Sequence, residues 1–141
     1  MEGKTIGKTK DQGWQIGVRK TLPVAPDHLW EFLVEPSRLA IWLSPSTDHE
    51  ASRLWSGQAV VFASGVQAVV RTIRPYSHFR LLYQRPQDPR PTRLQVRIIP
   101  ASQGSSTLAF HQELLQDAAH RALMKLHWLQ VIQRIEAALT Q

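Results

Sequence analysis

The C-terminal segment from Asp117 to Leu139 limits the folds open to this chain more than any other part of the sequence. Placed at about 100° per residue, its larger apolar residues gather in one sector of a helix. Asp117 is a suitable N-cap for that helix. At 1.5 Å per residue the helix would be about 33 Å long and would cross a small domain, so it needs a broad apolar surface to cover it. The sector contains Met124, Trp128, Val131, Ile132, Ile135, Ala138 and Leu139.

That surface is expected from the middle of the chain, where apolar runs alternate with turn residues. In two of the runs, apolar side chains alternate with polar or basic ones, which predicts one apolar sheet face and one wet, basic face. Most of the breaks are short enough for hairpins, so the strands should form an antiparallel meander. The run from Val66 to Ile73 does not alternate cleanly, which is compatible with a β-bulge in this strand. The strand-like runs are Gln58 to Ala63, Val66 to Ile73, Phe79 to Gln84, Arg93 to Ile99 and Thr107 to Glu113.

The N-terminal third predicts a tail, a strand and two short helices. Residues 1–12 contain few apolar residues and are expected to be a flexible tail, so that a single domain covers residues 13–141. The first strand is predicted from Trp14 to Leu22 and ends at Pro23. Pro26 suits a first helical position, and this helix should stop before Pro36. A second short helix is predicted from Ser37 to Leu43, followed by a loop over residues 44–57.

Composition excludes several classes of protein. The chain has 141 residues, enough to bury the core of one domain without a metal or a disulfide. It has no cysteine, which excludes disulfides, thiolate zinc sites and cysteine nucleophiles. No secretory signal or membrane-length apolar run is present, so a cytoplasmic protein with no membrane partner is expected. With 17 Lys and Arg against 11 Asp and Glu, the net charge of +6 raises nucleic acid or an anionic ligand as partners.

The sequence contains no convincing catalytic or metal-binding motif. His120 and His127 are seven residues apart on the helix, about 10 Å along its axis, which is too far to share one ion. His111 and Glu113 on one strand lack a third ligand. No nucleophile motif appears, and Glu31 with Glu35 is better explained as the solvent face of a helix. We therefore expect no metal, no cofactor and no enzymatic activity.

Three patches of residues, taken in order, cover residues 14 to 139. They are Val18 to Pro26 with Trp30 to Leu33, Pro36 and Ile41 to Leu43; then Val70, Ile73, Pro75 and Leu81; and Thr107, Leu108 and Phe110 through His127 and Trp128 to Ile135 and Leu139. In this order the patches resemble the START-like (SRPBCC) superfamily, in the branch of the activator of the heat-shock-protein-90 ATPase. Ala25 departs from the pattern, because members usually have a capping Ser or Thr there, so a weaker helix start is expected.

The resemblance implies an α+β helix-grip fold, a curved antiparallel sheet of about six strands around a long C-terminal helix, with two short helices after the first strand. In many members the apolar cavity between sheet and helix holds a lipid, polyketide, hormone or aromatic compound. The aromatic residues and the pliable Met of this sheet and helix suit such a cavity. The alternative is a filled core, which uses the same residue types. The cavity candidates are Trp42, Phe79, Leu81, Tyr83, Leu94, Val96, Phe110, Arg121, Met124, Trp128 and Val131.

The leading prediction is therefore a protein that binds a small apolar or aromatic molecule. Two alternatives come from the resemblance: a chaperone-associated stress protein, and a cyclase or aromatase with Tyr83 as proton donor and Arg121 as anion anchor. A salt bridge from Arg121 to Asp117 is the simpler interpretation of that residue. Nucleic acid is not expected as a partner, because the basic sheet face lacks aromatic residues for base stacking. That face carries Arg71, Arg80, Arg93 and Arg97.

A second apolar group on the long helix needs its own cover. It lies well away from the sector of Trp128, so one sheet cannot cover both groups. Either the short helix containing Trp42 packs there, which is the prediction we favour, or a second copy of the chain does. A monomer is expected, with a homodimer as the alternative. The group consists of Ala122, Leu123, Leu126 and Leu129.

Overall fold

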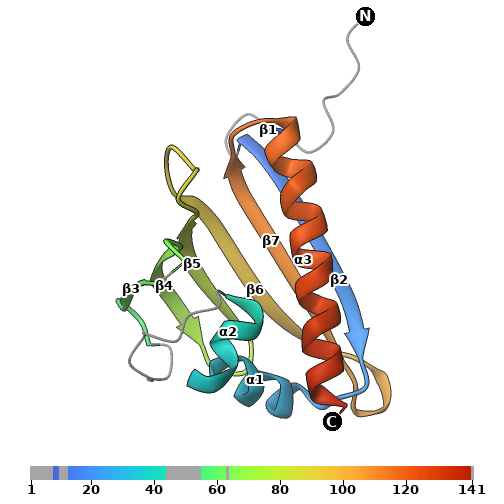
Figure 1. Cartoon of the computed structure of the whole chain (residues 1–141). Coiled ribbons are helices and arrows are strands. Elements are labelled where there is room, and N and C mark those ends of the chain that lie inside the picture. The colour runs from blue at the N-terminus through green and yellow to red at the C-terminus, as the bar shows by residue number, and fades with distance from the viewer. Residues whose placement is uncertain (1–7, 10–12, 44–54, 63, 141) are drawn as a thin grey trace, which may run out of the picture.

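In the computed structural model, residues 8–9, 13–43, 55–62 and 64–140 can be described. They form one antiparallel sheet with the strand order β1-β2-β7-β6-β5-β4-β3. All three helices lie on one face of this sheet, α3 along β2 and β7, and α1 and α2 towards β5 and β6 (Figure 1). The strands are β1 (Lys8–Thr9), β2 (Gly13–Leu22), β3 (Ala59–Val61), β4 (Gln67–Arg74), β5 (His78–Gln84), β6 (Thr92–Pro100) and β7 (Ser106–Leu115), and the helices are α1 (Pro26–Val34), α2 (Leu39–Trp42) and α3 (Ala118–Leu139), with 3-10 turns at Pro36–Arg38 and Ser102–Gly104.

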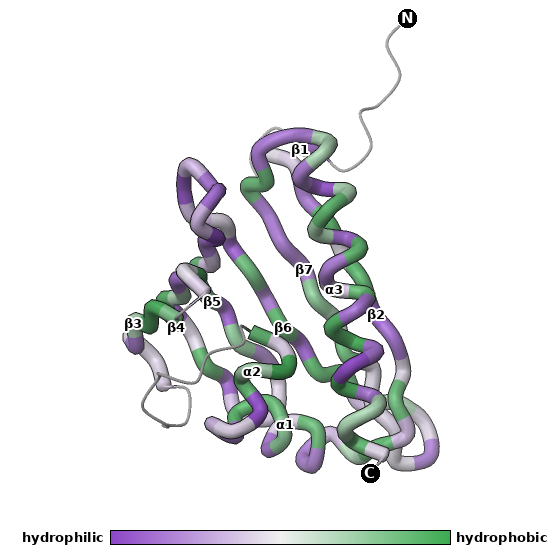
Figure 2. Tube along the Cα trace, viewed as in Figure 1, coloured by the Kyte–Doolittle hydropathy of each residue, from purple (hydrophilic) through white to green (hydrophobic). Residues whose placement is uncertain are grey.

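This architecture confirms the helix-grip prediction, including the two-faced sheet. Hydrophobic and hydrophilic residues alternate along β6 (Figure 2). The register places Val96 of β6 between Phe79 of β5 and Phe110 of β7, and all three side chains are buried. Because successive residues of a strand point to opposite faces, this row lies on the face that the helices cover. The bulge left open by the sequence occurs in β4, where the register shifts between Val70 and Thr72.

Helix α3 begins and packs as the sequence predicts. The Asp117 side chain accepts a 2.8 Å hydrogen bond from the backbone N–H of His120, which caps the helix. Five residues of the predicted sector are at most 2% exposed, and the last two are partly buried against the same core. The five are Met124, Trp128, Val131, Ile132 and Ile135.

Helix α1 starts without a side-chain cap, as expected from Ala25. Pro26 occupies its first turn, where a missing N–H costs no helical hydrogen bond. The helix buries the Trp30 ring, which stacks on Phe79 with a centroid distance of 4.6 Å. Burial of this apolar face therefore holds α1 on the sheet in place of a cap.

The structure differs from the sequence predictions at several boundaries. Lys8 and Thr9, assigned to a flexible tail, pair with Trp14 and Gly13 as a short edge strand. Backbone pairing forms this strand, so apolar periodicity cannot reveal it. The predicted helix from Ser37 to Leu43 is divided into a 3-10 turn and α2. Most of the predicted loop, residues 44–54, lies outside the described residues.

The second apolar group of α3 is not covered by a short helix, so that prediction is wrong. Leu123, Leu126 and Leu129 are 50%, 55% and 40% exposed. Helix α2 contacts α3 nearer the C-terminal end, where Arg134 donates from Nε to the backbone oxygen of Ile41 at 3.3 Å. None of the described helices is long and apolar enough to cross a membrane.

Candidate functional site

The space between the sheet and α3 brings together ten of the eleven predicted cavity residues. Each of the ten side chains is at most 2% exposed. They come from five elements that are distant in sequence, so the fold assembles one continuous apolar interior from them. These residues are Trp42 of α2; Phe79, Leu81 and Tyr83 of β5; Leu94 and Val96 of β6; Phe110 of β7; and Met124, Trp128 and Val131 of α3.

Aromatic rings form a chain across this interior. Phe79 stacks on Trp42 with a centroid distance of 5.8 Å, and Trp42 meets Phe110 at 6.4 Å. Phe110 in turn stacks on Trp128 at 4.8 Å, and Tyr83 meets the Trp128 ring at 5.6 Å with the two rings tilted by 60°. Aromatic rings in contact prefer offset-stacked or tilted arrangements, as these rings do. The interior therefore offers ring faces rather than aliphatic walls alone.

A chain of hydrogen bonds crosses the same interior. The indole Nε1 of Trp128 donates to the side-chain oxygen of Gln112 at 2.7 Å. Gln112 donates from Nε2 to the Thr92 hydroxyl at 2.9 Å, and this hydroxyl donates to the backbone oxygen of Tyr83 at 2.6 Å. Sequence reasoning missed Gln112, although it follows Phe110 by two residues and so had to share the buried face of β7.

His127 contributes a buried nitrogen that has no hydrogen-bond partner among the described residues. Its ring meets Trp128 edge to face at 4.6 Å. Its Nε2 is buried and forms no hydrogen bond with any described residue. Burial lowers the pKa of His127 to about 4, with Arg134 and Arg85 acting in the same direction. His127 is therefore neutral at ordinary pH. From the sequence, His127 is considered as a metal ligand and is set aside because of its spacing from His120; its position about 100° from Trp128 on the helical wheel does not decide between burial and exposure.

Tyr83 also contacts the Trp128 ring, with a centroid distance of 5.6 Å. The pKa of its phenol is raised to about 12, mainly by burial. The charge of Asp88 acts in the same direction, and the charge of Arg85 acts against it. The hydroxyl is therefore protonated under ordinary conditions and is a hydrogen-bond donor as well as an acceptor.

The loop after β5 is attached to the start of α3 by a buried ionic cluster. Asp88 accepts hydrogen bonds from the Arg85 backbone at 2.9 Å and from its Nη2 at 2.6 Å. Burial opposes the charge of Asp88, but these bonds and the Arg85 charge outweigh it and lower its pKa. The backbone N–H of Gln116 donates to Nδ1 of His120, so Nε2 carries the proton and lies 3.5 Å from Asp88 Oδ1.

Arg121 does not join the other candidates. Its Nε donates to the backbone oxygen of Gln15 in β2 at 2.7 Å, on the side of α3 that faces the edge of the sheet. The ion pair with Asp117 is not formed among the described residues, because Asp117 caps the helix instead. Arg121 therefore attaches α3 to β2 and is not placed to anchor an anion beside Trp128.

Four hollows of about 680, 310, 300 and 500 Å³ are lined by described residues. None of these four includes Trp128, Met124 or Tyr83 in its lining. They lie instead against α1, at the end of α3, beside β1 and on the outer sheet face. The described part of the chain contains no group of three His, Asp or Glu residues that could hold a metal ion.

Solved structures with similar folds include bacterial and eukaryotic proteins. An HSP90 activator from Plasmodium falciparum, PFC0360w, matches with a TM-score of 0.76 and 15% identity over 91% of this chain and 97% of that one. Protein MLL2253 from Mesorhizobium loti matches with a TM-score of 0.75 and 18% identity over 89% and 96%.

DynU16, a protein of the dynemicin biosynthetic locus, matches with a TM-score of 0.77 and 17% identity. The match covers 90% of this chain but only 47% of DynU16. No curated protein matches the chain. The family model described as "Activator of Hsp90 ATPase homolog 1-like protein" matches residues 23–140, from the end of β2 to the end of α3. The chain belongs to this family.

Proposed function

We propose that the protein binds a small apolar or aromatic molecule between the sheet and α3, with a polar group of the ligand against His127. The carrying observation is the buried Nε2 of His127 beside the Trp128 ring, for which the described part of the chain offers no hydrogen-bond partner. Buried polar atoms in folded proteins nearly always have a partner, so an orphaned one calls for an explanation. A ligand hydroxyl or carbonyl at this position would supply the missing hydrogen bond.

The interior favours a neutral ligand. His127 is uncharged at ordinary pH and Tyr83 keeps its proton, so neither offers a charge to an anion. Arg121 is directed towards β2. Burying a carboxylate among apolar rings without a cation would be costly. A flat compound with one hydroxyl, carbonyl or ring nitrogen fits these constraints, because it could stack on Trp128 and pair with His127.

The interior is closely packed, so binding would require its side chains to move. The rings from Trp42 to Trp128 contact one another, and none of the four hollows is lined by either tryptophan. Met124 is fully buried beside Trp128 on α3 and has an unbranched, adaptable side chain. We infer that a ligand enters by rearrangement of such side chains, which is how cavities that are closed in the free protein become occupied.

Neither alternative function has comparable support from the residues. A cyclase-like mechanism would use Tyr83 as acid, but Arg121, its proposed anion anchor, contacts β2. A chaperone partner follows from the family and from the likeness to the Plasmodium activator, and co-purification with an Hsp90-type chaperone would test it.

Native mass spectrometry of protein purified from its own host tests the proposal. We expect the wild type to retain a small neutral compound, and His127→Phe to retain much less of it. Leu126→Glu is the matched control, because it changes the exposed face of the same helix and should retain the compound. A wild type that carries no compound, or a His127→Phe variant that carries as much, would contradict the proposal.

A further inference from the structure

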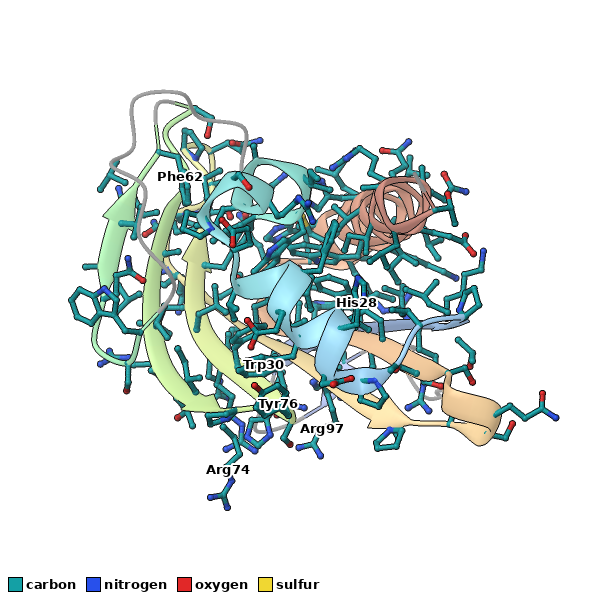
Figure 3. All side chains as sticks on the ribbon, turned by 90° about the horizontal axis from the view of Figure 1, so that it is seen from below. His28, Trp30, Phe62, Arg74, Tyr76 and Arg97 are labelled. Carbon is teal, nitrogen blue, oxygen red and sulfur yellow. The ribbon has the colours of Figure 1, made fainter. Side chains whose placement is uncertain are left out.

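The outer face of the sheet, away from the helices, carries a row of five cross-strand neighbours, four of which are basic residues and one an alanine. The register aligns Arg19 of β2 with Ala109 of β7, and Ala109 with Arg97 of β6. Arg97 is opposite His78 of β5, which is opposite Arg74 of β4. Figure 3 shows Arg74 and Arg97 on the side of the sheet away from the helices. At about 4.8 Å per strand the row is roughly 19 Å long.

In the described part of the chain, this row, which we call the basic row, has no acidic partner for its three arginines. Four residues earlier on β6, Arg93 is opposite Glu113 of β7 and lies 3.4 Å from its carboxylate. The corresponding partner of Arg97 is Ala109. No carboxylate of the described residues forms an ion pair with Arg19, Arg74 or Arg97. Arg19, Arg97 and Arg74 lie on alternate strands, about 10 Å apart, and charges at this spacing still repel one another, so the row favours an anion from outside the chain.

A hollow and a perturbed histidine support the same conclusion. A hollow of about 500 Å³ opens where Gly17 and Ala109 leave room, between Arg19 and Arg97. The Cα atoms of Arg19 and Arg97 are two strands apart, about 10 Å. Both guanidinium groups can therefore reach a single acidic segment. Burial lowers the pKa of His78, and Arg97, Arg80 and Arg74 lower it further. The face around the row is therefore electropositive.

The shape and composition of the face favour a polypeptide over nucleic acid or a membrane. The sheet bends around the helices, so its outer face is convex (Figure 3). A flat membrane would touch only part of a convex row. No Trp, Tyr or Phe belongs to the row, so bases would have no ring to stack on. Ile99 lines the hollow beside Arg97 and offers an apolar contact to a side chain of mixed sequence.

We propose that the basic row is a docking surface for an acidic segment of a partner protein, whose carboxylates lie over Ala109 between Arg19 and Arg97. This surface is on the opposite side of the sheet from the proposed ligand site. The two proposals are independent, and either can fail without the other.

Binding of a fluorescein-labelled Glu-rich peptide, measured by anisotropy at low and high ionic strength, tests the proposal. Ala109 is half-buried and points outward, so a longer side chain at this position is compatible with the fold. Ala109→Glu places a carboxylate of the protein itself between Arg19 and Arg97. This carboxylate should compete with the carboxylates of the peptide for the two arginines. Ala109→Gln is the matched control, with nearly the same size and no charge. Melting curves of both variants check that they are folded.

The peptide is expected to bind the wild type with an affinity that falls as salt rises. Ala109→Glu should weaken binding about tenfold or more, and Ala109→Gln by less than about twofold. Equal binding by all three proteins, or no binding to the wild type, would overturn the proposal. Tighter binding of oligothymidylate or of phosphatidylserine vesicles than of the peptide would overturn the choice of an acidic polypeptide.

Discussion

The indole nitrogen of Trp128 donates a 2.7 Å hydrogen bond to the side-chain oxygen of Gln112, and both residues are fully buried between α3 and β7. Gln112 in turn donates to Thr92, so one amide satisfies groups on α3 and β6 together. Because unpaired buried polar groups are costly, this pair determines how α3 lies on the sheet as well as how strongly it is held.

Gln112→Leu should destabilise the protein by about 2 to 4 kcal/mol, because it leaves the Trp128 N–H and the Thr92 hydroxyl with one partner fewer. Urea unfolding measures the change. Trp128→Phe combined with Gln112→Leu removes both members of the pair and should cost less than the sum of the single changes. Strictly additive costs would show that the hydrogen bond does not couple the two residues.

Trp128→Ala should cost about 3 to 5 kcal/mol, since the ring is fully buried and contacts Phe110, Tyr83 and His127. A thermal melt of this variant compared with the wild type is sufficient. A melting curve that coincides with the wild type would mean that another face of α3 is buried.

Met124→Glu and Leu126→Glu compare the two faces of α3 within one helical turn. Met124 is 1% exposed and Leu126 is 55% exposed. A buried glutamate without a partner should unfold the domain, whereas the exposed one should change stability by less than about 0.5 kcal/mol. Circular dichroism and sedimentation velocity of both variants test this difference. Sedimentation also tests the homodimer alternative, which predicts that Leu126→Glu converts a dimer into a monomer with an intact fold.

Asp88→Ala should cost about 2 to 3 kcal/mol, because it leaves Arg85 without its buried partner and releases the loop from His120. Arg93→Ala is the control. It removes an ion pair whose Arg side chain is half exposed, and such pairs contribute less than about 1 kcal/mol. Similar costs in urea unfolding for the two variants would show that the buried cluster contributes no more than the exposed pair.

The stability of the wild type should fall as the pH is lowered from about 6.5 to 4. The pKa of His127 is about 4 in the folded protein and near 6.5 in an unfolded chain, so the unfolded state binds more protons between these values. The free energy of unfolding therefore decreases with acidification in that window. The lowered pKa values of His120 and His78 act with the same sign.

His127→Phe should make this dependence shallower and should stabilise the protein near pH 5, because it replaces an orphaned nitrogen by an apolar ring. Urea unfolding at pH 5 and pH 8 measures both effects. If His127→Phe leaves the pH dependence unchanged, His127 is not the group that titrates.

Much of the fold could be predicted because apolar periodicity reports burial directly. The sector of Met124 and Trp128 on α3 and the alternation in β6 follow from that rule, and both are confirmed. Arg121 shows its limit. Its seven-residue spacing from Trp128 places Arg121 in the same sector of α3. That sector is wide, so Arg121 can face β2 while His127 faces the interior beside Trp128.

The polar part of the interior could not be identified from the sequence for a related reason. His127 lies at the edge of the helical sector, where a residue can be solvated or buried with equal ease. Whether it has a partner depends on side chains brought in from other elements. The basic row likewise depends on strand register, which decides that Arg97 is opposite Ala109 while Arg93 is opposite Glu113.

The Trp128 indole N–H provides the most direct test of ligand binding between the sheet and α3. In nitrogen-15 NMR spectra of the protein, titrated with the uncharged aromatic probe N-phenyl-1-naphthylamine, the Trp128 indole signal should shift and the shift should saturate. The exposed Trp55 signal should not move. His127→Phe should weaken the response, and Leu126→Glu should leave it unchanged. A Trp128 signal that stays fixed while surface resonances move would contradict an interior binding site.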